Sequence, residues 1–152
     1  MFKGYIKDKN EFEKPELIDQ FINLCKEKDY DVIITCTARD YKYQTALFAQ
    51  GRETLAQVNK LRRLAGVYLI TNAENQRKVT WTMNSKHIVN LEDDKLNNNK
   101  ARAFDFCLIK NGKEDWNNIE GFKACGLLGE TLGLYSGQRF KSPDYPHLEI
   151  PS

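Results

Sequence analysis

The sequence has 152 residues and a mass of 17.6 kDa, which is the size of one domain whose core folds without disulfides or a structural metal. The sequence contains 23 Lys and Arg residues and 21 Asp and Glu residues. Because the two signs are mixed along the chain, we expect no nucleic-acid-binding surface. No apolar run approaches the ~20 residues of a membrane span. We therefore expect one domain over residues 1–152 and no membrane insertion.

The four cysteines are too far apart in the sequence to form a C-x-x-C pair. They are Cys25, Cys36, Cys107 and Cys125. Most of them lie in apolar surroundings, where free cysteine behaves as a small hydrophobe, so we expect reduced thiols rather than disulfides or a zinc ribbon. Residues 1–7 lack the apolar segment of a secretory signal. Together these features predict a protein that is made in the reducing cytoplasm.

The first half of the sequence predicts three helices and one strand. Pro15 suits the first turn of a helix, and apolar residues follow it at helical spacing as far as Cys25. The β-branched run over 32–37 predicts a buried strand. A second helix is expected over 40–50, because an aspartate can cap its start and a glycine follows its end. Apolar spacing predicts a third helix over 55–65.

The second half of the sequence predicts mainly strands. Residues 79–83 have the composition of a strand or its lead-in, and residues 101–109 alternate as a strand does. We expect a helix over 115–128, a short strand after Pro146, and an exposed loop over 90–100. Helices that come first and strands that cluster late favour an α+β fold over a doubly wound parallel sheet.

The chain has two histidines, His87 and His147, and Asp105 lies between them in an otherwise apolar strand. Two imidazoles and one carboxylate suit a catalytic zinc, which takes three protein ligands and leaves a fourth position open. A carboxylate within an apolar strand needs a partner. That partner is either a metal ion or a neighbouring arginine, and the spacing alone leaves both possibilities open.

Five short segments carry a further pattern. They are Thr37 to Gln44, Ser85 to His87, Ala101 to Phe106, Gly133 to Phe140, and Asp144 to Glu149. In order and composition they resemble the zinc peptidases that include D-alanyl-D-alanine carboxypeptidases and L-alanyl-D-glutamate endopeptidases, whose signature is S-x-H-x-x-G-x-A-x-D followed later by D/E-x-P-H. The resemblance extends from about residue 30 to 150. It implies a small antiparallel sheet that carries the zinc site and packs with helices.

The chain departs from this signature in the spacing of its aspartate. The family places the aspartate seven residues after the first histidine, whereas Asp105 lies 18 residues after His87. Asp94 has the family's spacing, but its neighbours lack the strand context A-x-D-[FL]. An insertion of 11 residues within 88–99 restores the match to Asp105, and loops accept such insertions at little entropic cost. Ala101 stands where the family has glycine.

The resemblance implies that His87, Asp105 and His147 hold Zn²⁺. It further implies that Asp144 is the general base toward the attacking water, and that Arg39 steadies the developing oxyanion. These residue types suit those roles. Zinc lowers the pKa of bound water to roughly 7, and a guanidinium is a permanently charged planar fork.

Three further residues are candidates for contacts with substrate: Ser85, Gln44 and Tyr135. For Ser85 and Gln44 the alternative is a hydrogen bond that shapes the loop or the helix start, and for Tyr135 it is packing. The acidic, asparagine-rich loop Asn90 to Lys100 is a candidate site for a regulatory cation such as calcium, which prefers oxygen ligands.

The resemblance predicts a peptidoglycan peptidase that cleaves the stem peptide, most like the L-alanyl-D-glutamate endopeptidases of phage lysis systems. One alternative is a D-alanyl-D-alanine carboxypeptidase or dipeptidase. Another is a non-catalytic, zinc-bearing module that binds the cell wall, since hedgehog-type domains share this site architecture. We expect a monomer that stays in the cytoplasm until it is released to the wall.

Overall fold

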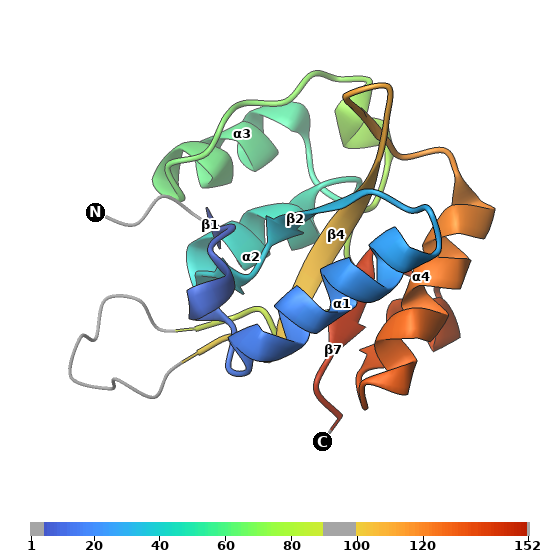
Figure 1. Ribbon diagram of the computed structural model, residues 1–152. Coiled ribbons are helices and arrows are strands. Elements are labelled where there is room, and N and C mark those ends of the chain that lie inside the picture. The colour runs from blue at the N-terminus through green and yellow to red at the C-terminus, as the bar shows by residue number, and fades with distance from the viewer. Residues whose placement is uncertain (1–4, 90–99, 152) are drawn as a thin grey trace.

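The computed structural model describes residues 5–89 and 100–151, and these residues form an α+β fold (Figure 1). Within the described ranges there are four α-helices and a five-stranded sheet whose strand pairs are all antiparallel. The expected fold class is therefore confirmed. The small sheet holds the side chains that matter for the candidate site.

The long strand β4 (Ala103–Lys110) is the centre of the sheet. Strand β2 (Val32–Cys36) pairs with one side of β4 and β7 (His147–Glu149) with the other, and β6 (Tyr135–Ser136) completes that edge. The short strand β5 (Lys113–Asp115) turns back onto the end of β4. Every other strand of this sheet except β6 is thus hydrogen-bonded to β4.

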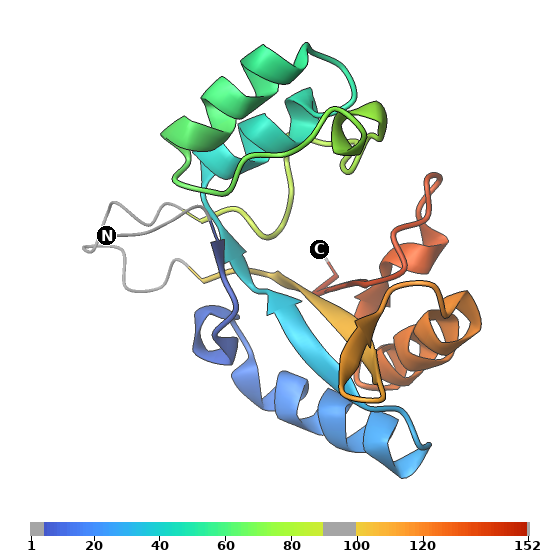
Figure 2. The same ribbon diagram turned by 90° about the horizontal axis from the view of Figure 1, so that it is seen from above.

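The helices lie on opposite sides of the sheet (Figure 2). Helices α1 (Pro15–Glu27) and α4 (Ile119–Thr131) pack against each other and against one face. Helices α2 (Tyr41–Ala49) and α3 (Leu55–Leu64) form a separate pair across the sheet from them. The face between the strands and this second pair is where the polar side chains gather.

The main core consists largely of aromatic rings between the sheet and its two helices. Phe21 of α1 contacts two rings of β4, with centroid distances of 5.5 Å to Phe104 and 5.0 Å to Phe106. Phe122 of α4 lies 5.4 Å from Phe106. All four rings are buried, and the two edge-to-face pairs of Phe21 add about 0.5–1.5 kcal/mol each beyond the burial of their area.

The register of β4 directs its charged residue away from this core. Asp105 pairs with His147 of β7 and with Cys36 of β2, while Phe104 pairs with Leu148. Residues paired across antiparallel strands have their side chains on the same face, and neighbours along a strand alternate. Asp105 therefore shares a face with His147, opposite the aromatic core.

A second, two-stranded sheet brings another part of the chain to this polar face. Strand β1 (Tyr5–Ile6) pairs with β3 (Ala38–Arg39). The Arg39 amide donates to the carbonyl of His87 at 2.8 Å, and the Val89 amide donates to the carbonyl of Arg39 at 3.0 Å. The segment that carries His87 is therefore fixed alongside Arg39.

Most of the predicted elements are confirmed. The structure contains the helices expected from Pro15, over 40–50 and over 55–65, and the strands expected over 32–37 and 101–109, with shifts of a few residues at their ends. The aspartate at the start of α2 caps it as expected, since its carboxylate accepts from a backbone amide at 2.8 Å.

Two expectations differ from the structure. Residues 79–83 form no strand and do not pair with a sheet. This segment borders the pocket. The helix expected over 115–128 begins only at Ile119, since residues 113–115 form β5. The Asn111-Gly112 turn before β5, with φ of 53° and 75°, is a hairpin signal that the sequence contained. The loop expected over 90–100 lies, apart from its last residue, outside the described residues.

All four cysteines are buried free thiols. Three of them, Cys25, Cys107 and Cys125, belong to the main core, whereas Cys36 lies at the end of β2. In the part of the chain that the structure describes, no helix has the length and apolar character needed to cross a membrane.

Replacing a central core ring tests this packing. Phe104→Ala removes a fully buried ring, and we expect it to lower the free energy of unfolding by about 3–5 kcal/mol. Leu127→Ala on α4 is the control, because Leu127 is 48% exposed and we expect a change within about 0.5 kcal/mol. Denaturant unfolding followed by circular dichroism measures both. Equal effects would contradict this description of the core.

Candidate metal centre

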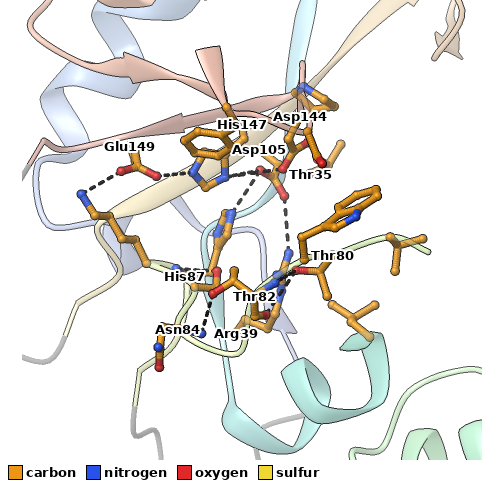
Figure 3. A pocket seen from close by; sticks show the side chains of 18 of the residues that line it. Thr35, Arg39, Thr80, Thr82, Asn84, His87, Asp105, Asp144, His147 and Glu149 are labelled. Carbon is orange, nitrogen blue, oxygen red and sulfur yellow. Dashed lines mark hydrogen bonds and ion pairs between the residues drawn. The ribbon is translucent and has the colours of Figure 1, made fainter. Parts of the chain in front are cut away.

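Three side chains from three different parts of the chain converge on the carboxylate of Asp105 (Figure 3). His87 Nε2 lies 3.1 Å and His147 Nδ1 lies 3.4 Å from the same oxygen, Asp105 Oδ1. Arg39 Nη2 lies 3.5 Å from the other oxygen. Asp105 therefore has both kinds of neighbour that the sequence left open, an arginine and the two candidate metal ligands.

The ring of His87 is held by the main chain on its far side. Its Nδ1–H donates to the carbonyl of Thr37 at 2.8 Å, because a carbonyl oxygen can only accept. The Nε2 atom is thereby directed toward Asp105. Ser85 contributes locally, since its hydroxyl accepts from the His87 amide at 3.2 Å. Ser85 thus shapes the loop that presents His87 and also lines the pocket.

The ring of His147 is held by a carboxylate instead. Its Nε2–H donates to Glu149 at 2.8 Å, and the ammonium of Lys86 contacts the same carboxylate at 2.7 Å. Nδ1 of His147 is left to face Asp105. Metal-ligating histidines commonly donate their second ring N–H to a carboxylate or a backbone carbonyl, and His87 and His147 show one example of each.

The turn before β7 sets the position of Asp144 next to His147. The His147 amide donates to the carbonyl of Asp144 at 3.2 Å, closing a turn over these four residues. Asp144 Oδ2 then lies 3.9 Å from His147 Nδ1. Gly137 permits this arrangement, because a Cβ there would collide with the carbonyl of Asp144 and come within 2.9 Å of His147 Cβ. Because of this turn, the D-x-P-H spacing places the side chains of Asp144 and His147 next to each other.

Two groups of potential metal ligands result, and Asp105 belongs to both. One group contains Cys36, His87 and Asp105, and the other contains Asp105, Asp144 and His147. Within each group the ligand atoms lie within 4.8 Å of one another. The described residues therefore hold buried His, Asp and Cys groups that could hold a metal ion. The expected set of two histidines and Asp105 is divided between these groups.

The donor set fits zinc. Each histidine keeps one ring nitrogen directed at a shared carboxylate oxygen while its other nitrogen is occupied, and the two ring centroids are 5.1 Å apart. Imidazole nitrogen and carboxylate oxygen are ordinary zinc ligands, and zinc is tolerant in its geometry. His87, Asp105 and His147 would be the residues that hold it.

The charges of His87 and Asp105 depend on each other. Burial by itself lowers the pKa of His87, but the negative charge of Asp105, the influence of Cys36 and the hydrogen bond to Asp105 together raise that pKa to about 10. Burial raises the pKa of Asp105, yet the charge of His87 and hydrogen bonds from both histidines hold it well below its usual range. The histidine and the aspartate therefore form an ion pair at neutral pH.

Asp144 differs from Asp105 in both position and charge. Its side chain is 47% exposed and lines the pocket. The loss of water around its carboxylate, together with the negative charge of Asp105, raises its pKa to about 6. Asp144 is consequently the carboxylate of the centre that can take up and release a proton near neutral pH.

Arg39 is positioned by residues behind it. Its Nη1 donates to Gln44 Oε1 at 2.8 Å, and the Gln44 amide donates in turn to the carbonyl of Thr82 at 2.7 Å. Gln44 is fully buried and does not line the pocket, so it orients Arg39 instead of contacting substrate directly. Burial lowers the pKa of Arg39, but Cys36 and Asp105 raise it above its ordinary value.

The centre lies in an open pocket of about 710 Å³. Arg39, Asp105 and Asp144 line it, and Trp81, Trp116 and Phe140 supply aromatic walls. The structure thus brings together all the sequence-predicted residues except Tyr135. Tyr135 stacks on Phe140 with ring centroids 5.9 Å apart and does not line the pocket, which agrees with packing. Asp94 and the candidate calcium loop lie outside the described residues.

Sequence reasoning missed three residues of this centre. Glu149 and Lys86 hold His147, and Cys36 lies 3.8 Å from both His87 Nδ1 and Arg39 Nη2. For Glu149 a signal existed, because it is two residues after His147 on a strand and so shares its face. Lys86 and Cys36 carry no such signal in the sequence.

Zinc binding should release protons. At pH 7 the raised pKa of His87 keeps its Nε2 protonated, and zinc can bind this nitrogen only after the proton has left. We expect at least about one proton to be released per zinc bound at pH 7, and affinity to rise with pH. Titration calorimetry in buffers of different ionisation enthalpy measures this number. A binding enthalpy independent of the buffer would contradict the ion pair.

The two candidate aspartates can be separated by mutation. We expect Asp105→Ala to abolish zinc retention, because it removes the carboxylate oxygen that both histidines face. Asp94→Ala removes the aspartate at the family's spacing. We expect this variant to retain about one equivalent of zinc, because Asp94 is not one of the three proposed ligands. Elemental analysis of both purified variants is the measurement. Loss of zinc from Asp94→Ala but not from Asp105→Ala would mean that the insertion lies elsewhere in the chain.

No protein-family model matches this chain, and no curated protein matches it. The capacity to bind a metal is therefore inferred from the geometry of this chain alone. That geometry consists of the carboxylate of Asp105 and the two histidines that face it, whose second ring nitrogens donate to Thr37 and Glu149.

Proposed function

We propose that the chain is a zinc-dependent peptidoglycan peptidase that cleaves the stem peptide, most like an L-alanyl-D-glutamate endopeptidase of the phage endolysin type. The observation that carries this proposal is the convergence of His87, His147 and Arg39 on Asp105 inside an open pocket. The resemblance of the five sequence segments to zinc peptidases supports the same reaction.

Zinc held by His87, Asp105 and His147 would supply an activated water at neutral pH and polarise the carbonyl of the scissile bond. The chain's own residues support that chemistry by presenting nitrogens in a fixed orientation. Thr37 and Glu149 each occupy the second nitrogen of one ring, so neither ring has to reorient when the metal binds.

Asp144 is the proton carrier of the proposed reaction. Its carboxylate lines the pocket, where an ionised carboxylate can accept a proton from water. The same carboxyl then returns that proton to the leaving amine when the peptide bond breaks. Its position in the pocket, 3.9 Å from His147, allows it to reach a substrate.

Arg39 is the electrostatic partner of the proposed reaction. Its guanidinium lines the pocket beside Asp105 and is fixed from behind by Gln44. A cation fixed in this way stabilises an oxygen that becomes anionic, and it needs no reorganisation to do so. A purely structural zinc module requires neither this arginine nor Asp144, and so the two residues favour catalysis over the non-catalytic alternative.

One experiment separates the candidate functions. Purified peptidoglycan is digested with the zinc-loaded protein, and mass spectrometry identifies the soluble fragments. Fragments with a new D-glutamate amino terminus support the endopeptidase, whereas release of terminal D-alanine supports the carboxypeptidase. Wall binding without fragments would support the non-catalytic module and overturn the proposal.

The base can be distinguished from a ligand by mutation. Asp144→Asn keeps the shape of the side chain but removes its proton transfer, so we expect zinc to be retained and wall hydrolysis to fall by at least about 10²-fold. His147→Ala is the comparison and should lose both zinc and activity. Loss of zinc from Asp144→Asn would make Asp144 a ligand, and full activity would place the base elsewhere.

A further inference from the structure

A second cavity adjoins the metal centre. It has a volume of about 300 Å³ and shares five lining residues with the main pocket, among them Arg39, Asp105 and Trp116. Both volumes fall within the range of roughly 300–1,000 Å³ that is common for ligand sites. Because Asp105 lines both cavities, the metal centre lies at the boundary between them.

The amino-terminal strand forms one wall of this second cavity. Tyr5 of β1 pairs with Arg39 of β3, and its ring lies 5.2 Å from that of Tyr43. Lys7 follows on the same segment and also lines the cavity. The sequence resemblance begins only near residue 30, so this wall is a feature that the resemblance does not predict.

Tyr68 and Glu114, which also line this cavity, contact neighbouring side chains. Tyr68 lines the cavity and is anchored by the buried Arg62, whose Nε–H donates to the Tyr68 carbonyl at 2.6 Å and whose guanidinium lies 4.6 Å from the ring. Glu114 is fixed by the indole N–H of Trp116, which donates to it at 3.0 Å. The cavity is therefore lined by phenol rings, an ammonium group and a carboxylate.

These groups suit an extended peptide as well as a single terminal residue of a substrate. Lys7 can pair with a substrate carboxylate and Glu114 with a substrate amine, while the phenol rings pack against the chain between them. Arg39 retains an unpartnered, buried Nε–H among the described residues, and it separates this cavity from the main pocket. A peptide crossing the centre would therefore find contacts on both sides of Asp105.

We infer that the second cavity binds substrate residues on the far side of the scissile bond, so that the enzyme acts on an extended peptide bearing charged side chains and cuts it internally. This inference rests on the proposed peptidase function. It assigns a specificity role to Lys7 and Tyr68, which lie outside the catalytic centre.

The test compares a long and a short substrate. The long one is a soluble muramyl pentapeptide, and the short one is an end-blocked dipeptide that spans only the bond the wild type cuts. We expect Tyr68→Ala and Lys7→Met each to lower the ratio of kcat/KM for long over short substrate by roughly tenfold. Tyr41→Ala is the matched control, because Tyr41 is 60% exposed against 63% for Tyr68 and lines neither cavity.

A binding measurement separates this inference from the proposed function. Calorimetry follows the muramyl pentapeptide binding to the zinc-loaded wild type and to Tyr68→Ala. Weaker binding to Tyr68→Ala supports the cavity even if the wild type cleaves neither substrate, which would overturn the peptidase proposal alone. Cleavage with an unchanged ratio and unchanged binding in both cavity variants would overturn the inference and leave the peptidase proposal standing.

Discussion

The largely buried carboxylate of Asp105 is the constraint around which the rest of the centre is arranged. An ionised carboxylate in the middle of a sheet is costly unless charge and hydrogen bonds compensate it. His87, His147 and Arg39 provide that compensation from three separate parts of the chain. Each of these parts must therefore be folded before the carboxylate is satisfied. This dependence ties β3, the loop of His87 and β7 to the central strand.

Strand β4 serves both the stability of the fold and the chemistry of the site, because its two faces differ. Phe104 and Phe106 point into the aromatic core beneath α1 and α4, while Asp105 between them points the other way. The alternation of a strand thus places a charged group within one residue of the best-packed part of the molecule. The core holds the strand rigid, and a rigid strand keeps the carboxylate in position for its partners.

The two aspartates of the centre are kept apart in charge behaviour by their surroundings. Asp105 faces two histidines, which hold its pKa low despite burial, whereas desolvation and the negative charge of Asp105 raise the pKa of Asp144. One carboxylate is thereby suited to holding a cation and the other to moving a proton. Divergent environments of paired titratable groups are a common way to divide such roles.

The sequence by itself determined the local features of this protein. Helix starts at Pro15 and Asp40, the alternation around Asp105 and the turn spacing of Asp144 and His147 all follow from interactions between near neighbours. Only the tertiary structure decided which side chains meet across long separations. It placed Cys36 and Lys86 at the centre, put Gln44 behind Arg39, and made β1 a wall of the second cavity. The physical reason is that strand pairing and packing between distant segments set these contacts, and no sequence period records them.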